Sequence, residues 1–247
     1  MVDARVIGPD PAIAAWAEAA LPRAVAALAG ADRRAGGTWA VGLDLLDNDP
    51  AGGIAGVPLP WGVLGLAPEP LHRAQLSTVH PGYPRPDPGE PASANAWRLI
   101  RDAAHLDGLL PIGPDKRRRV KEPHAWILGL PLTDNPAAPL VVWPGSATIL
   151  RAALLTALHP HPPETWPEVD VTDAYIAARR HVLNTCRRVE LPVRRGQATL
   201  LHRLCLHGVA PWGDSAETTP RIIAYFRPQL SSVQAWLAET GLTAPPP

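Results

Sequence analysis

The sequence predicts a mainly β fold of the α+β class, with helices flanking a barrel. Two apolar runs near the C-terminus, residues 197–211 and 221–228, have the turn-bounded or alternating form of buried strands. Ala-rich or amphipathic runs at residues 11–29, 146–158 and 168–184 have helical spacing. A length of 247 residues suits one barrel with a helical flank and does not require a second domain.

The N-terminal part predicts a helical cover followed by two strands. In residues 11–29, Leu21 and Leu28 recur at helical spacing among alanines. This pattern predicts one or two amphipathic helices that pack against a sheet. Residues 39–44 and 71–79 are expected to form early strands of that sheet.

Two further helices are predicted in the second half, at residues 146–158 and 168–184. The first is expected to start after Ser146, whose hydroxyl would cap the first turn. We expect the whole chain to form a single domain. Its expected parts are a helical flank, a barrel with helical insertions, and a frayed proline-rich tail: residues 1–35, about 36–235 and 243–247.

One histidine stands out at the end of the apolar run 197–211. If this run is one regular strand, alternate side chains share a face, and that face carries Thr199, Leu201, Arg203, Cys205 and His207. His202 lies on the opposite face, among leucines. His207 adjoins Gly208, where a loop can open towards a pocket, so we expect His207 to be a ligand and His202 to be a packing residue.

A second chemical signal is the pair His105 and Asp107. In an extended segment, residues two apart point to the same side and can bind one ion together. By itself the pair is more typical of a surface turn, because Asp107-Gly108 is also turn-forming. Together with His207, however, it supplies two imidazoles and a carboxylate. Such a set can occupy one face of iron(II) and leave the other positions for a bidentate co-substrate and O2.

The run 221–228 predicts another strand, with one apolar and one charged face. Its parity places Arg221, Tyr225 and Arg227 on the same side. An arginine that faces into a barrel needs a partner, and its planar guanidinium fits a carboxylate with two parallel hydrogen bonds. A dicarboxylic co-substrate would supply that partner for Arg221.

With these motifs in their order, the C-terminal two-thirds of the chain resembles the phytanoyl-CoA dioxygenase family of iron(II)- and 2-oxoglutarate-dependent oxygenases. The matching segments are residues 105–108, 130–134, 139–146, 196–201, 207–208 and Arg221. The resemblance implies a double-stranded β-helix fold. It also implies that His105, Asp107 and His207 bind Fe(II), and that Arg221 holds the distal carboxylate of 2-oxoglutarate.

The chemistry implied by this resemblance is oxidative decarboxylation of 2-oxoglutarate to succinate and CO2. It is coupled through O2 to hydroxylation of an unactivated C–H bond. Asp107 argues against halogenation, because halogenating relatives have a small residue at the carboxylate position. Desaturation and ring formation stay open.

Three positions depart from the family pattern: Ala147, Trp212 and Ile223. Ile223 stands where a serine or threonine is common, which removes the usual second hydrogen bond to the co-substrate carboxylate. Tyr225, Thr199 or another polar group would then have to supply it. Gln75, on the strand before the metal motif, could face the pocket and bind the co-substrate or the substrate; a surface-facing glutamine is an equal alternative.

Two features give the only hints about the substrate. The run 116–121 contains both lysines of the chain, and Arg118 and Lys121 could clamp a substrate carboxylate or phosphate, although a solvated loop is the more usual role of such a run. Trp126 begins an apolar run and could line the cavity, although packing in the core is the more usual role of a large aromatic side chain. We expect a small free metabolite, since no long basic groove for a CoA phosphate is evident.

Composition limits the other partners. The 23 Lys and Arg residues balance 23 Asp and Glu residues, so no overall charge favours nucleic acid or an anionic membrane. No apolar run is long enough to cross a bilayer, and the N-terminus is unlike a signal peptide. Two cysteines imply no disulfide framework, so we expect a cytoplasmic protein. The oligomeric state cannot be predicted.

Two other functions stay open on the sequence. The barrel could bind a ligand without catalysis, although the three metal-compatible residues would then lack a reason. Alternatively, a cupin-like metal dioxygenase could use the same residues without 2-oxoglutarate. Arg221 distinguishes the cupin-like enzyme from the 2-oxoglutarate-dependent oxygenase, because only the 2-oxoglutarate-dependent enzyme needs this arginine.

Overall fold

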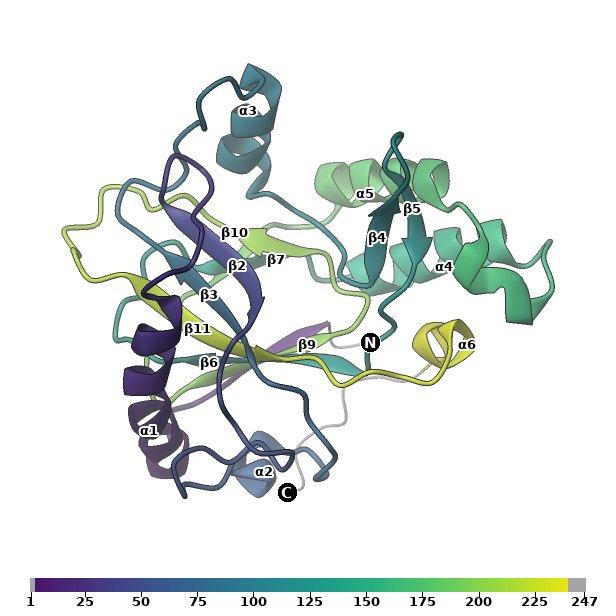
Figure 1. The fold of residues 1–247 in the computed structure, drawn as a ribbon. Coiled ribbons are helices and arrows are strands. Elements are labelled where there is room, and N and C mark those ends of the chain that lie inside the picture. Colours follow the sequence, from purple (N-terminus) through teal and green to yellow (C-terminus); the bar gives the residue numbers. More distant parts are fainter. Residues whose placement is uncertain (1–2, 240–247) are drawn as a thin grey trace.

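The computed structural model describes residues 3–239 and has a mixed α and β architecture with antiparallel sheets (Figure 1). Its larger sheet has six strands. In spatial order they are β1 (Ala4–Ile7), β9 (Ala198–His202), β6 (Trp126–Pro131), β11 (Arg221–Phe226), β3 (Gln75–Val79) and β2 (Trp39–Asp44). Except for β2 and β3, which are consecutive strands, neighbours in this order are far apart along the chain, so the sheet joins the two ends of the sequence.

A smaller sheet lies against one face of the larger sheet. It contains β10 (His207–Val209), β7 (Leu140–Val142) and β8 (Val189–Leu191), in that order. Side chains from both sheets form one buried cluster, with Ile127 and Leu201 from the larger sheet against Leu140 and Val142 from the smaller. The interior face of the larger sheet is therefore the face that carries Ile127 and Leu201.

Helix α1 (Pro11–Leu28) covers the opposite, outer face of the larger sheet. Its buried residues recur at three- and four-residue spacing and include Ile13, Trp16 and Ala20. Trp16 packs edge-on against Phe226 of β11, with ring centroids 6.0 Å apart. The helix predicted at residues 11–29 is confirmed, and its N-terminus is capped by the side chain of Asp10.

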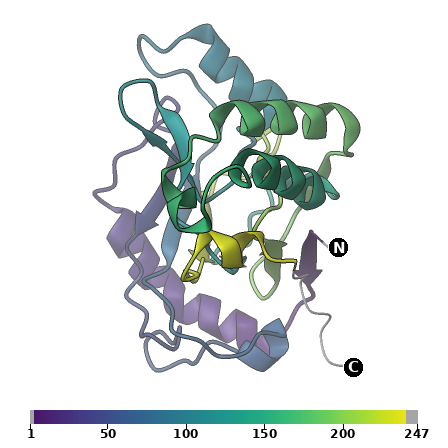
Figure 2. The same ribbon diagram turned by 90° about the vertical axis from the view of Figure 1, so that its right-hand side faces the viewer.

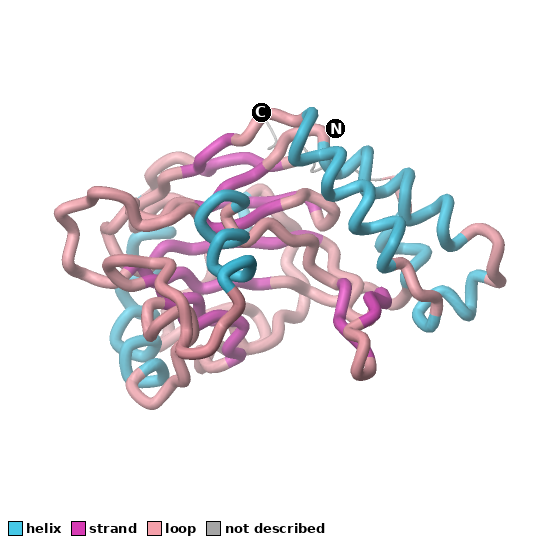
Figure 3. Tube along the Cα trace, turned by 90° about the horizontal axis from the view of Figure 1, so that it is seen from above, coloured by secondary structure: helices cyan, strands magenta, loops and turns pink. Residues whose placement is uncertain are grey.

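The remaining helices do not share one side of the molecule: the later ones lie away from α1, whereas the short second helix packs in the same core cluster as α1 (Figures 1 and 3). They are α2 (Trp61–Leu64), α3 (Ala92–Arg101), α4 (Ser146–Leu158), a 3-10 helix (Pro163–Glu168), α5 (Thr172–Thr185) and α6 (Val233–Leu237). Helices α4 and α5 pack side by side (Figure 2). The hairpin of β4 (Leu109–Ile112) and β5 (Arg117–Val120) contacts the 3-10 helix and α5. Across residues 3–239, no helix is long and apolar enough to cross a membrane.

The start of α4 differs from the sequence prediction. Ser146 is already inside the helix, and its hydroxyl accepts a hydrogen bond from the Leu206 N–H at 2.9 Å instead of capping the first turn. The buried Asp3 carboxylate takes over the capping role and accepts from the N–H groups of Gly145 at 2.8 Å and Ala147 at 3.1 Å. A residue more than a hundred positions away thus stabilises the helix start.

The predicted continuous strand at residues 197–211 is wrong, because the chain turns at Arg203 and Leu204. β9 ends at His202 in the larger sheet, and β10 begins at His207 in the smaller sheet. The side chain of Arg203 donates to the carbonyl oxygens of Ala235 and Trp236 around α6 and so holds the turn. His207 therefore reaches the interior from a different sheet, and the shared face predicted from strand parity does not extend to it.

Other boundaries agree more closely with the sequence. The predicted strand at residues 39–44 is β2, and β11 occupies most of the predicted run 221–228. The strand predicted at residues 71–79 is shorter and starts at Gln75, while Leu71 packs into the core beneath α1. The tail predicted at residues 243–247 lies outside the described residues.

Candidate metal centre and co-substrate pocket

Three side chains meet where the two sheets face each other. One ligand atom from each of His105, Asp107 and His207 can be chosen so that all lie within 4.8 Å of one another. Asp107 Oδ1 lies 3.3 Å from His105 Nε2, and Asp107 Oδ2 lies 3.8 Å from His207 Nε2. The chain thus brings together all three residues of the predicted metal site.

A pair of backbone hydrogen bonds fixes the two histidines beside each other. His105 and His207 exchange N–H to carbonyl bonds of 2.8 and 3.1 Å as an isolated antiparallel bridge. Gly208 is required here, because a Cβ at this position would collide with the carbonyl oxygen of Asp102. The buried Asp102 carboxylate is held in turn by Arg188, with contacts of 2.7 and 2.8 Å.

Both imidazoles are oriented for metal binding through Nε2. His105 Nδ1 lies 3.0 Å from the carbonyl oxygen of Ala103, and His207 Nδ1 lies 3.0 Å from that of Cys205. A carbonyl oxygen can only accept, so in the neutral ring Nδ1 carries the proton and Nε2 keeps its lone pair. Metal-binding histidines commonly make this kind of second hydrogen bond, which sets the ring's tautomer and angle.

The local electrostatics match a ligand set. Burial, together with the neighbouring His105, lowers the pKa of His207 to about 4, so its ring is neutral at neutral pH. Burial opposes ionisation of Asp107, but the hydrogen bond from His105 and electrostatic interactions with His207, His105 and Arg227 hold the pKa of Asp107 well below its usual range. Burial also works to lower the pKa of His105, yet the bond to Asp107 outweighs it and the pKa is raised. A metal cation bound by His105 and Asp107 would replace the proton that lies in the hydrogen bond between these two side chains.

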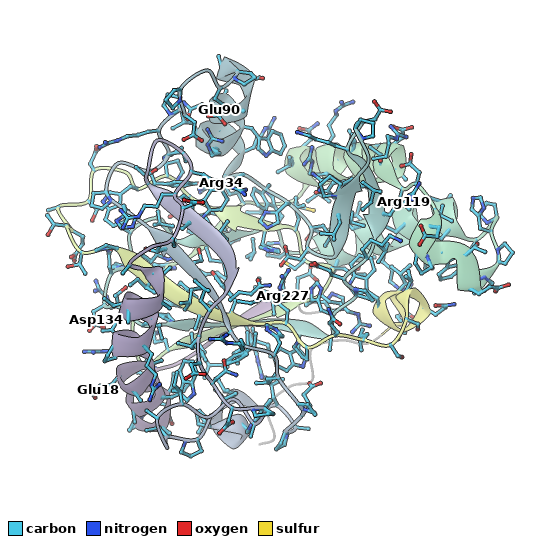
Figure 4. The ribbon with its side chains drawn as sticks, viewed as in Figure 1. Glu18, Arg34, Glu90, Arg119, Asp134 and Arg227 are labelled. Carbon is cyan, nitrogen blue, oxygen red and sulfur yellow. The ribbon has the colours of Figure 1, made fainter. Side chains whose placement is uncertain are left out.

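Arg227 is a further neighbour of the metal carboxylate that the sequence did not single out. It lies just after β11, and its Nη1 contacts Asp107 Oδ2 at 2.8 Å. Its side chain is central in the molecule, between the larger sheet and the hairpin with α4 and α5 (Figure 4). The ion pair fixes the direction of the Asp107 carboxylate.

A cavity of about 230 Å³ opens beside these residues, lined by the metal triad and by both sheets. Gln75 of β3 and Tyr225 of β11, which are partners in the sheet register, both line it. Thr199 is buried on β9 opposite Gly129, and a Cβ at Gly129 would meet both Thr199 Oγ1 and the Tyr225 ring. The structure thus places Gln75, Tyr225 and Thr199 on the interior face, where the sequence expected co-substrate contacts.

At one end of this interior face lies a group of four donors that we call the donor cluster: Arg221, Trp39, Tyr83 and Trp212. Arg221 and Trp39 flank Val79 in the sheet register, and the rings of Trp39 and Tyr83 are 5.6 Å apart. Trp212 packs in the same apolar cluster, and its backbone N–H donates to the backbone carbonyl of Tyr83 at 2.8 Å.

Within residues 3–239, the donor cluster lacks an acceptor. Arg221 Nη1, Trp39 Nε1, Tyr83 Oη and Trp212 Nε1 are all buried without a hydrogen-bond partner. Burial raises the pKa of the Tyr83 phenol, so this group stays protonated and able to donate. Buried donors are nearly always paired, and a single carboxylate can accept several hydrogen bonds at once. Four buried donors without an acceptor match the chemistry of an anionic, acceptor-only ligand; of the four, Trp39 lines the metal cavity, whereas Arg221, Tyr83 and Trp212 lie behind its wall.

The aromatic members of the donor cluster were missed by the sequence reasoning. Trp212 was noted only as a departure from a family pattern, and Trp39 only as a strand residue. Their one available signal was that Ile223 cannot supply the second hydrogen bond, which left an unnamed donor to be found.

The three candidate substrate contacts do not line the metal cavity, and Trp126 takes the core-packing role that its sequence context favoured. Trp126 lies on the outer face of β6 in the α1 core, with its Nε1 donating to Glu69 at 3.1 Å. Arg118 Nη1 donates to the Leu109 carbonyl at 3.1 Å across the hairpin, and Lys121 pairs with Glu168. None of them lines the metal cavity within the described part of the chain. Figure 4 labels Arg119, of the same charge run, in the hairpin lobe away from Arg227.

Comparison with known proteins gives similarity in structure only. No protein-family model matches the sequence, and a search of curated proteins finds no match. Among solved structures, the chain is similar to the non-heme α-ketoglutarate-dependent carbocyclase SnoK from nogalamycin biosynthesis, with 14% identity, a TM-score of 0.52, and coverage of 94% of this chain and 84% of that one. The chain therefore shares the fold of SnoK.

Two weaker similarities accompany it. The α-ketoglutarate-dependent epimerase SnoN, also from nogalamycin biosynthesis, has 17% identity and a TM-score of 0.43, over 92% of this chain and 79% of that one. EctD from S. alaskensis, in a structure with bound Fe, has 14% identity and a TM-score of 0.40, over 92% and 73%.

Proposed function

We propose that this protein is an Fe(II)- and 2-oxoglutarate-dependent oxygenase built on a double-stranded β-helix, related to the phytanoyl-CoA dioxygenase family. The observation that carries the proposal is the pairing of two features on one interior face. One is a set of two histidines and a carboxylate, and the other is a donor cluster that lacks an acceptor. A metal site alone would not need four buried donors beside it.

The residues divide the work as follows. Nε2 of His105, Nε2 of His207 and the carboxylate of Asp107 would hold the iron. Arg221, with Tyr83 and the two indole N–H groups, would hold the distal carboxylate of 2-oxoglutarate. Gln75, Tyr225 and Thr199 would contact the remaining length of the co-substrate. When bound, the pair of cofactors supplies the oxidising power for C–H chemistry with O2 and releases succinate and CO2.

The surrounding chain orients and protects this chemistry. The bridge between His105 and His207 sets the spacing of the two imidazoles, and Arg227 fixes the direction of the Asp107 carboxylate. The apolar wall of Ile127, Leu140 and Leu201 limits the entry of water. We propose hydroxylation of a small metabolite as the outcome, by a single oxygenase domain. A cytoplasmic location agrees with the two cysteines being unpaired.

The proposal is tested by turnover in the absence of a prime substrate. The protein with iron(II) and O2 should slowly convert 2-oxoglutarate to succinate, and His207→Ala should abolish the conversion. His161→Ala, at an exposed histidine, is the matched control and should keep it. A ligand-binding barrel without catalysis would release no succinate in any of these proteins.

A cupin-like dioxygenase that does not use 2-oxoglutarate is the second alternative. Arg221→Ala separates it from the proposed function at the level of binding. Loss of 2-oxoglutarate affinity with iron affinity retained supports the proposal. Equal 2-oxoglutarate affinity in the variant and the parent would favour the cupin-like enzyme.

A further inference from the structure

A second cavity, of about 430 Å³, lies next to the metal cavity and shares two wall residues with it, Gln75 and Arg227. We call it the outer cavity. The rest of its polar wall consists of Asp44, His72, Glu122, His124 and Gln229. None of the three substrate contacts expected from the sequence belongs to this wall within the described residues.

Two carboxylates of the outer cavity have no strong partner. No hydrogen bond from residues 3–239 reaches the carboxylate of Asp44, whose nearest charged contact is His72 Nδ1 at 3.9 Å. Glu122 is in the same condition, with Arg227 Nη2 at 3.9 Å. Surface pairs of this length contribute little, so both carboxylates can accept hydrogen bonds from a ligand.

His72 does not neutralise Asp44, because its ring is already engaged. The backbone N–H of Arg227 donates to His72 Nε2 at 2.9 Å, which makes Nε2 the acceptor. Nδ1 then carries the proton in the neutral ring and lies 2.6 Å from the Arg73 carbonyl. Both ring nitrogens thus serve the local fold.

His124 contributes a buried acceptor that lacks a partner. His124 is 2% exposed as a whole residue and forms part of the wall of the outer cavity. Nδ1 lies 3.1 Å from the Glu122 carbonyl, so it carries the proton, and Nε2 has no hydrogen-bond partner among the described residues. Burial lowers the pKa of His124 to about 4, which keeps the ring neutral and Nε2 an acceptor at neutral pH.

The charge of the outer cavity is therefore net negative. Arg227 is the only arginine or lysine in its described wall, and its Nη1 is already paired with Asp107 at 2.8 Å. The same guanidinium extends Nη2 towards Glu122, so it spans the distance from the outer cavity to the metal carboxylate. A ligand in the outer cavity would lie within one side chain of the metal centre.

We infer that the outer cavity is the prime-substrate site and that the substrate is a small metabolite with an amino group. Its ammonium would be held by the carboxylates of Asp44 and Glu122 and by His124 Nε2. That the ligand is a substrate rests on the proposed function, whereas the preference for an ammonium group follows from the residues that line the outer cavity. Three acceptors around one cavity match the three N–H donors of a primary ammonium group. The ligand charge that the outer cavity favours is opposite to the charge that a clamp at Arg118 and Lys121, the less usual alternative for that run, would select.

The test uses three probes of one size and shape: cyclohexylamine, cyclohexanol and cyclohexanecarboxylate. Each is titrated into the metal-free protein while amide chemical shifts are followed by NMR, so that no turnover is needed. We expect the amine to bind with a Kd about tenfold lower than that of the alcohol, which corresponds to about 1.4 kcal/mol, and the carboxylate to bind most weakly. The shifts should centre on Gln75 and Gln229.

The double variant Asp44→Asn, Glu122→Gln should reduce the preference for the amine over the alcohol to about twofold or less. Both side chains are partly exposed, at 60% and 42%, so the variant is expected to fold. Asp47→Asn is the matched control, because Asp47 is an exposed carboxylate near Asp44 that does not line the outer cavity, and this variant should keep the full preference.

Three results would overturn the inference. They are no measurable amine binding, equal or tighter binding of the alcohol or the carboxylate, and an amine preference that survives in the double variant. The same titration repeated with iron(II) and 2-oxoglutarate under anaerobic conditions separates this inference from the proposed function. If the protein selects the amine but does not bind iron(II) and 2-oxoglutarate, the outer cavity is an amine site on a protein of another function. If the protein binds iron(II) and 2-oxoglutarate but does not select the amine, the oxygenase function stands and amines are excluded as its substrate class.

Discussion

Replacing Tyr83 with phenylalanine removes one hydroxyl donor from the donor cluster and keeps the aromatic ring in place. In the protein without co-substrate, the Tyr83 hydroxyl is buried and has no partner among the described residues. A buried polar group in that condition costs about 1–3 kcal/mol. Tyr83→Phe should therefore leave the melting temperature unchanged or raise it by about 2–4 °C, the shift that about 1 kcal/mol gives in a chain of this size.

The same variant should bind 2-oxoglutarate more weakly. A hydrogen bond to a charged group contributes about 1.5–3 kcal/mol, and because three other donors share the carboxylate, we expect the lower end of that range. The Kd for 2-oxoglutarate should rise about tenfold, as measured by anaerobic titration at saturating iron(II). Weaker binding without loss of stability is the signature of a donor reserved for a ligand.

Tyr175→Phe is the matched control for this experiment. The Tyr175 hydroxyl accepts from the Leu106 N–H at 3.2 Å, so its loss should lower the free energy of unfolding by about 1 kcal/mol. The Kd for 2-oxoglutarate at saturating iron should not change. If Tyr83→Phe loses stability and keeps the parent Kd, the phenol has a structural partner and the assignment of the donor cluster is refuted.

Three further predictions concern binding, pH and capping. Arg221→Met should raise the Kd for 2-oxoglutarate by at least about 100-fold without lowering the melting temperature, since Arg221 Nη1 has no described acceptor; parent-like affinity by calorimetry would count against the role of Arg221. For His124, the pKa is lowered to about 4 in the folded protein from 6.5, so as the pH falls the unfolded state takes up the proton first and stability is lost below about pH 6.5. From pH 7 to pH 5 this residue should account for about 2 kcal/mol of lost unfolding free energy, and His124→Gln should remove that part of the slope in urea titrations; an unchanged slope would contradict the assignment. Asp3→Asn weakens the carboxylate cap on α4 and should lower the unfolding free energy by about 1 kcal/mol, a drop of about 2–4 °C in thermal melts; an unchanged melting temperature would show that the cap contributes nothing.

Local patterns in the sequence were enough for several elements and for the composition of the metal site. The helical spacing in residues 11–29 and the alternation in residues 221–228 correspond to α1 and β11, because each buries one continuous face. His105, Asp107 and His207 could be proposed as one group because two imidazoles and a carboxylate suit iron(II) and because the order of the motifs resembles a known oxygenase family. Their convergence in space is a property of the fold that spacing alone does not contain.

Each feature that could not be predicted from the sequence depends on contacts between residues that are far apart along the chain. The apolar run across residues 197–211 continues through the turn at Arg203, so no local signal marked the passage from one sheet to the other. The cap of α4 comes from Asp3, far away in the chain. β6 is buried on both faces, so alternation placed Trp126 with its neighbours correctly but could not tell which face lines the interior. The acidic partners of the run 116–121 also lie far from it along the chain.

The proposed function requires one interior face of the protein to hold iron(II) and 2-oxoglutarate together. Its most direct test is an anaerobic titration of the metal-free protein with iron(II) and then 2-oxoglutarate, with the visible absorption spectrum recorded at each step. We predict a weak metal-to-ligand charge-transfer band that grows to one equivalent of 2-oxoglutarate and that is absent in His207→Ala. Full iron binding by the parent protein without this band would contradict the account.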